Sequence, residues 1–116
     1  MKHVNVSKHR SPFKVVADGA SSQAAVMTLK PGDSSSDHPE NEHPRAEQWV
    51  YVISGAGRAK TSARSVSLKQ GSLLLIEKNE AHQITNTGKQ PLVTLNFYAP
   101  PAYTPDGEVK KSVQRQ

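Results

Sequence analysis

Short apolar runs, each closed by a turn signal, are the feature that most restricts the folds open to this chain. The strongest run, residues 48–53, is almost wholly β-branched and aromatic and ends at Ser54-Gly55-Ala56-Gly57, where glycine permits a tight reversal. Nowhere does an apolar i, i+3, i+4, i+7 pattern persist for a dozen residues, so no long helix is expected. The pattern predicts seven or eight short strands in an all-β sandwich or small barrel, with runs at 13–17, 23–29, 48–53, 65–68, 72–76, 82–86 and 92–98.

Length and composition fit one globular domain. A chain of 116 residues, 34% apolar and 22% charged, can build its own core but is short for two. It has no cysteine, which excludes disulfides and thiolate metal sites. No apolar run approaches the roughly 20 residues of a membrane span. No apolar segment follows the basic N-terminus, so we expect a cytoplasmic protein without a membrane partner.

The two ends of the chain are expected to lie outside the barrel. Residues 1–116 form a single predicted domain, with an N-terminal arm over 1–12 and a Pro-rich C-terminal arm over 100–116. Prolines cannot donate to a strand ladder, so the second arm is expected to lie against the body as a loop.

The net charge of +5 suggests polyanion binding until its distribution is considered. Residues 32–48 carry five acidic side chains against Arg45 alone, and the basic residues are spread over the remainder. These basic residues have neither aromatic neighbours at regular intervals nor a recognition helix, so nucleic acid is not an expected partner. The acidic segment also contains two of the five histidines, and it would attract a cation.

His43, Gln48 and His82 are the side chains that point most directly to chemistry. Strand periodicity allows His43 and Gln48 to project into the barrel from one region, and His82 from a later strand. Imidazole nitrogens suit zinc, iron, copper and nickel, and amide or carboxylate oxygens suit harder ions such as manganese. Two histidines with one oxygen ligand leave coordination positions open for water or substrate.

Alternation along the strands makes further predictions about faces. Glu42 is expected opposite His43 unless a bulge turns it inward. Trp49, Tyr51 and Ile53 are expected to pack between sheets or in a dimer interface. The last apolar run is interpreted as a core face, with a second face whose relation to the pocket is undecided; the core face is Val93, Leu95 and Phe97 and the other Thr94, Asn96 and Tyr98.

Two segments carry a family resemblance in their spacing. One runs from Gly32 and His38 through Asn-Glu-His-Pro-Arg-Ala-Glu-Gln (41–48) to Gly55, and the other from Gly71 through Glu-Lys-Asn (77–79) and His82 to Asn86. They resemble the first and second motifs of the cupin superfamily, and the first is similar to the germin version. This resemblance implies a small single-domain cupin with the double-stranded β-helix (jelly-roll) fold.

The same resemblance implies a metal site with altered ligands. His43 and His82 match two of the family's metal positions, whereas Gln48 stands at its Glu position and Asn41 at its first His position. The implied ligands are therefore His43, Gln48 and His82, and the implied ion is Zn, Mn, Fe, Ni or Cu with its occupancy left open. His38, Asn41 and Asn86 are candidates for further ligands or pocket residues.

Two functions follow as hypotheses. The leading one is a cupin that binds a divalent transition metal and a small polar or anionic organic ligand, whether or not it is an oxygenase- or isomerase-type enzyme. The alternative is a metal-free sensor in which Asn41, Gln48 and Asn86 hydrogen-bond the ligand. Resemblance to small cupins also implies a homodimer, with which the flat apolar strand at Trp49 is compatible.

Overall fold

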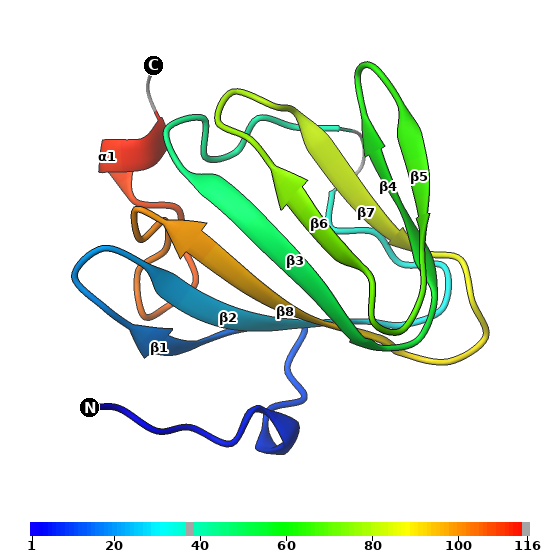
Figure 1. Cartoon of the computed structure of the whole chain (residues 1–116), viewed down its shortest axis with the longest axis horizontal. Helices are drawn as coiled ribbons and strands as arrows, with labels where there is room; N and C mark the ends of the chain where they lie inside the picture. The colour runs from blue at the N-terminus through cyan, green and yellow to red at the C-terminus, as the bar shows by residue number, and fades with distance from the viewer. Residues whose placement is uncertain (37–38, 115–116) are drawn as a thin grey trace.

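The computed structural model describes residues 1–36 and 39–114, and its strands form two antiparallel sheets that face each other (Figure 1). The larger sheet has the strand order β1-β2-β8-β3-β6 and the smaller one β5-β4-β7. No helix within the described residues is long and apolar enough to cross a membrane. The elements are η1 (Val6–Lys8), β1 (Phe13–Asp18), β2 (Gln23–Leu29), β3 (Glu47–Ser54), β4 (Gly57–Thr61), β5 (Ser65–Leu68), β6 (Leu73–Ile76), β7 (His82–Asn86), β8 (Leu92–Ala99) and α1 (Lys111–Gln114).

The all-β prediction is confirmed, and seven of the eight strands coincide with an apolar run. The exception is β4, where Gly57 and Ala59 are buried while Arg58 and Lys60 point to solvent. This strand has the alternation of a half-buried strand but only small residues on its inner face. Its apolar signal is therefore too weak to be recognised in the sequence.

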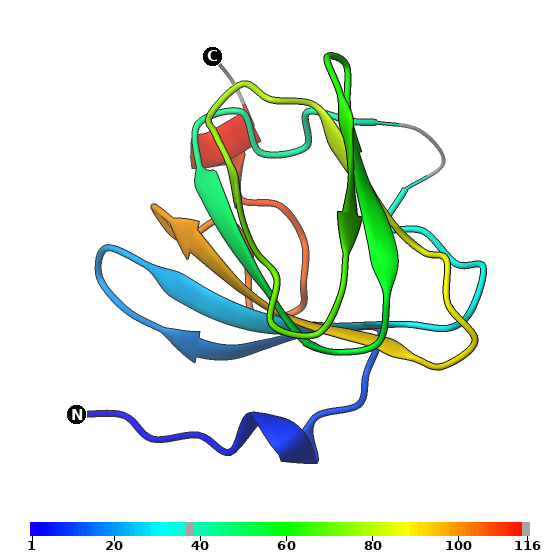
Figure 2. The same cartoon turned by 45° about the vertical axis from the view of Figure 1, so that its right-hand side comes forward.

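The core fills the space between the two sheets, whose strands Figure 2 shows after a turn of 45°. Val50 and Val52 of β3 are fully buried and pack in one cluster with Ala59, Leu68 and Ile84 from the smaller sheet. Removal of apolar side chains from water is the main term that favours such a barrel. A second cluster lies where the chain after β8 packs against the larger sheet.

The outer face of the larger sheet differs from the sequence prediction. Phe97 and Trp49 are each 39% exposed, as their side chains point away from the core. The interpretation of Val93, Leu95 and Phe97 as a core face holds for Val93, which is buried, but is wrong for Phe97, while Leu95 is only partly buried. Trp49 and Tyr51 do not pack between the sheets, and their alternative placement in a dimer interface stays a prediction. Instead Thr94, Asn96 and Tyr98 are the buried face of β8. Polar residues occupy the inner positions because the barrel encloses a site as well as a core.

The segment after β8 is fixed to the barrel by the buried side chain of Gln23. Its Nε2 donates to the carbonyl of Tyr103 at 2.7 Å. Its Oε1 accepts from the backbone amides of Ala102 at 3.1 Å and Tyr103 at 3.0 Å. Val113 of α1 is also buried, and its carbonyl accepts from the amide of Arg45. The segment thus forms one wall at this end of the barrel.

Candidate functional site

The structure brings His43, Gln48 and His82 together inside the barrel. His43 lies in the turn before β3, Gln48 is the second residue of β3, and His82 begins β7. The two imidazole centroids are 5.1 Å apart, and Nε2 of His43 lies 3.0 Å from Oε1 of Gln48. The predicted residues therefore lie in one cluster, to which β3 and the turn before it contribute from the larger sheet and β7 from the smaller one.

Backbone carbonyls fix the protonation of both rings at Nδ1. Nδ1 of His43 lies 3.1 Å from the carbonyl of Ala46, and Nδ1 of His82 lies 2.9 Å from that of Glu80. A carbonyl can only accept, so each Nδ1 must donate. In a neutral ring this leaves Nε2 with a lone pair, the arrangement that metal-binding histidines usually have. Burial lowers the pKa of His82, which favours its neutral form.

Gln48 is oriented by Asn96, which sequence reasoning left undecided. Nδ2 of Asn96 lies 3.3 Å from the carbonyl of Ala25 and 3.1 Å from Oγ1 of Thr94. Because the carbonyl requires a donor, Oδ1 of Asn96 is the atom that accepts from Nε2 of Gln48 at 3.1 Å. The remaining amide oxygen, Oε1 of Gln48, then faces His43.

The contact between His43 and Gln48 requires a hydrogen or a metal ion between the two atoms. Because Nδ1 of His43 donates to Ala46, a neutral His43 has a lone pair on Nε2, which faces a lone pair on Oε1 of Gln48. Water cannot easily separate the two atoms, since His43 is 2% and Gln48 4% exposed. Either a proton on Nε2 or a metal ion relieves this contact. Two ligands about 2.1 Å from a metal can stand 3.0 Å apart at a bond angle near 90°. The residues therefore fit a bound cation.

No group of three His, Cys, Asp or Glu side chains within residues 1–36 and 39–114 is placed to hold a metal ion. A metal at this site would therefore need the amide oxygen of Gln48 besides the two imidazoles. Amide oxygens are neutral ligands, and they leave the full charge of the ion available to attract an anionic group.

The other candidates lie apart from this cluster or outside the described residues. Asn41 is exposed in the loop before β3. Asn86 donates to the carbonyls of Leu29 and Gln90, each at 2.8 Å, and accepts from the amide of Gly88, so its amide is engaged in holding loops together. It does not line the cavity described below. His38 falls outside the described residues.

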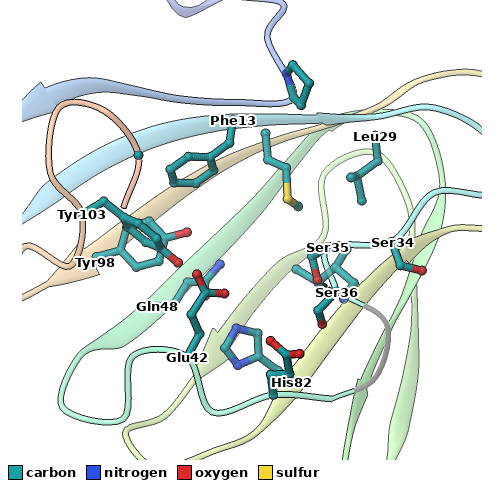
Figure 3. A pocket seen from close by; sticks show the side chains of 15 residues that line it. Phe13, Leu29, Ser34, Ser35, Ser36, Glu42, Gln48, His82, Tyr98 and Tyr103 are labelled. Carbon is teal, nitrogen blue, oxygen red and sulfur yellow. Dashed lines mark hydrogen bonds between the residues drawn. The ribbon is translucent and has the colours of Figure 1, made fainter. Parts of the chain in front are cut away.

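A cavity of about 310 Å³ opens beside the cluster (Figure 3). Gln48 and His82 line it, and so does Glu42, which the simple alternation rule placed on the opposite face. Residues 41–46 belong to no strand, and residues 43–46 form a turn closed by a hydrogen bond from the amide of Ala46 to the carbonyl of His43 at 3.0 Å. Strand alternation does not apply in such a turn, so Glu42 and His43 can both face inward.

Two tyrosines complete the polar part of the cavity, one on the strand face left undecided from the sequence and one that the sequence did not indicate. Tyr98 comes from β8 and Tyr103 from the segment after it, and their ring centroids are 4.9 Å apart. The carboxylate of Glu42 lies close enough to both phenols to act on them electrostatically. Burial raises the pKa of both phenols, so they remain neutral O–H groups at physiological pH.

Comparison with known proteins agrees with this architecture. The family model described as a cupin domain matches residues 25–98, well over half of the chain. Protein SchB of Streptomyces halstedii is 32% identical over 90 residues, which cover 78% of this chain and 63% of SchB. Oxalate decarboxylase OxdC of Bacillus subtilis is 31% identical over 91 residues, which cover 74% of this chain and 22% of OxdC. The chain thus spans less than two thirds of the length of these relatives.

Among solved structures, a conserved protein with a double-stranded β-helix domain from Klebsiella pneumoniae is similar to this chain with a TM-score of 0.76. The match covers 96% of this chain and 99% of that one at 21% sequence identity, which shows the fold. The predicted double-stranded β-helix is thereby confirmed. With its family model, strand topology and motif spacing in agreement, the chain belongs to the cupin superfamily as one of its small members.

Proposed function

We propose that this cupin binds a divalent transition-metal ion through His43, Gln48 and His82, and a small organic ligand in the adjoining cavity. The observation that carries the proposal is the contact of 3.0 Å between Nε2 of His43 and Oε1 of Gln48. Hydrogen bonds to Ala46 and Asn96 leave both atoms as acceptors, and a cation between them satisfies both.

A bound metal would supply a Lewis acid at the polar end of the cavity. The chain's own residues would bind and orient the ligand there. Tyr98 and Tyr103 keep their protons, and Glu42 offers a carboxylate that accepts a hydrogen bond. Such a set of groups suits a polar or anionic ligand with at least one hydroxyl group.

The first experiment is a metal titration of protein purified without a tag and stripped with a chelator. We expect one ion per chain for at least one of Zn²⁺, Mn²⁺, Fe²⁺, Ni²⁺ and Cu²⁺ by isothermal titration calorimetry. Gln48→Glu should tighten binding about tenfold, because it places a charged oxygen ligand where the amide stands. Glu47→Gln, which changes a neighbouring side chain outside the cavity, should leave the affinity within about twofold. Absence of binding by every ion would contradict the proposal.

A metal-free binding protein is the second candidate function. The buried hydrogen bonds that link Asn96 to Gln48 and Gln48 to His43 favour it, since a proton on Nε2 of His43 satisfies the contact with Oε1 of Gln48. The titration separates the two candidates, because stoichiometric metal excludes the metal-free form.

We also propose that two copies of the chain associate through the outer face of the larger sheet. Five large apolar side chains are exposed there: Trp49, Tyr51, Leu73, Leu75 and Phe97. Trp49 pairs with Leu75 on one side and Phe97 on the other, and Tyr51 pairs with Leu73, so the patch is continuous across three strands. A second copy would cover the same patch by two-fold symmetry, and β6 at the sheet edge is open to pairing.

Light scattering after size-exclusion chromatography tests this association. The unaltered chain should elute as a dimer, and Leu73→Glu should weaken the dimer at least about tenfold, because it places a charge in an apolar contact. Leu73 is 61% exposed, so the variant should keep the fold. Ser67→Glu, on the exposed face of the smaller sheet, is the control. If the unaltered protein were monomeric at a chain concentration of about 100 µM, the proposed dimer would be excluded.

A further inference from the structure

The cavity beside His82 has two chemically different walls (Figure 3). One wall is apolar and consists of Phe13 from β1, Met27 and Leu29 from β2, and Ile84 from β7. The facing wall is polar, with Gln48 and His82 joined by Glu42 and the hydroxyl-bearing rings of Tyr98 and Tyr103. A ligand that fills the cavity must therefore have an apolar body and a polar edge.

The charges on the cavity walls limit which polar groups the ligand can carry. Among the described residues that line the cavity, Glu40 and Glu42 are acidic and none is Lys or Arg. A cation between His43 and Gln48 would be countered by the carboxylate of Glu42, which Figure 3 shows at the centre of the polar wall. A small dianion such as oxalate would place its second carboxylate against this side chain without a basic partner, which is unfavourable. It would also leave the apolar wall uncovered.

A hydroxyl group fits the same place. Glu42 lines the cavity, and a carboxylate can accept several hydrogen bonds. A ligand with two adjacent hydroxyls can donate one proton to Glu42 and direct the other oxygen toward Gln48 and His82. Its ring would then lie on Met27, Leu29 and Phe13, within a volume of about 310 Å³.

We infer that the ligand of this cavity is a neutral or singly charged aromatic compound with adjacent hydroxyl groups, and that Glu42 selects it against small dicarboxylates. The inference rests on the proposed function, because it places the ligand in the same cavity. The inference does not require a bound metal ion, because His43 does not line the cavity and the two walls are the same with or without the ion.

The test is calorimetric titration of the whole chain, in its metal-loaded and stripped forms, with 2,3-dihydroxynaphthalene, catechol and oxalate. The naphthalenediol should bind at least about tenfold tighter than catechol, because its second ring covers the apolar wall. Oxalate should bind weakest. Met27→Gln should remove most of the advantage of the second ring, and Met27→Leu, which keeps an apolar side chain of similar size, should retain it.

A charge-matched pair of variants tests the selection by Glu42. Glu42→Gln should shift the ratio of oxalate to naphthalenediol affinity at least about tenfold toward oxalate. Glu47→Gln removes the same charge from a neighbouring residue that does not line the cavity, and should leave the ratio unchanged. Equal shifts in the two variants would overturn the inference, as would oxalate binding tighter than the naphthalenediol, or no diol binding, in the unaltered chain.

The outcomes also separate this inference from the metal proposal. Binding of the naphthalenediol by a chain that takes up no metal would contradict only the metal site. Metal uptake without discrimination among the three probes would contradict only the ligand class.

Discussion

His82→Ala is expected to weaken metal binding by about 100-fold or more, because it removes one of two imidazole ligands. The ring is preorganised for this role, since its Nδ1 donates to the carbonyl of Glu80 and burial lowers its pKa. A neutral ring is the form that binds a metal without first losing a proton. Competition with a chromophoric chelator measures the affinity, for whichever ion the unaltered chain binds best.

The control for this variant is His3→Ala, because His3 lies in the exposed N-terminal segment. It should bind metal as tightly as the unaltered chain. His82 is only partly buried, so His82→Ala should fold, and circular dichroism of the stripped protein verifies this. His43→Ala is a less clean probe, because the ring of His43 contacts those of Tyr98 and Tyr103. Equal affinity of His82→Ala and His3→Ala would contradict the proposed ligand set.

Gly55→Ala is expected to lower the free energy of unfolding by about 3–5 kcal/mol, since it combines backbone strain with overpacking. Gly55 has φ +91° in the turn between β3 and β4, where an added Cβ would overlap the carbonyl oxygen of Pro91 and lie 2.9 Å from Cα of Leu92. Both obstacles are backbone atoms of the β7–β8 connection and the start of β8, which cannot move without disturbing the sheet. Urea unfolding followed by circular dichroism gives the magnitude.

Gly71→Ala separates the two causes. Gly71 has nearly the same backbone angle, φ +89°, but nothing lies within 4 Å of an added Cβ. It should therefore lose only about 1–2 kcal/mol, the cost of the left-handed backbone for a residue with a side chain. If the two variants lost equal stability, the close approach of Gly55 to Pro91 and Leu92 would have no energetic importance.

The strands were predictable from the sequence because most are short apolar runs between turn residues. The order of the strands in the two sheets could be predicted only through the family resemblance, because a short stretch of sequence does not show which distant strand it pairs with. β8 lies between β2 and β3 in the larger sheet, although many residues separate it from both strands in the chain. Alternation identified two faces on β8 but not which one the barrel encloses, so Phe97 was placed wrongly.

The site was predictable to the extent that motif spacing defines it. His43, Gln48 and His82 were found because their separations along the chain are those of the cupin motifs. Asn96 and Tyr103 carry no such signal, since each reaches the site through strand register or through a hydrogen bond to a residue about 80 positions away. Glu42 was expected on the opposite face because strand alternation was extended into a turn.

The hydrogen bonds of Gln23 hold the backbone of Tyr103 in place at the cavity. Tyr103 lies beyond residues 25–98, the part of the chain that matches the family model, and one side chain anchors the backbone that carries it. Substitution of Tyr103 would therefore change the polar wall of the cavity without altering the barrel strands or the two histidines. If the cavity binds a ligand as proposed, its ligand preference would be open to change at a residue outside the part of the chain that matches the cupin model.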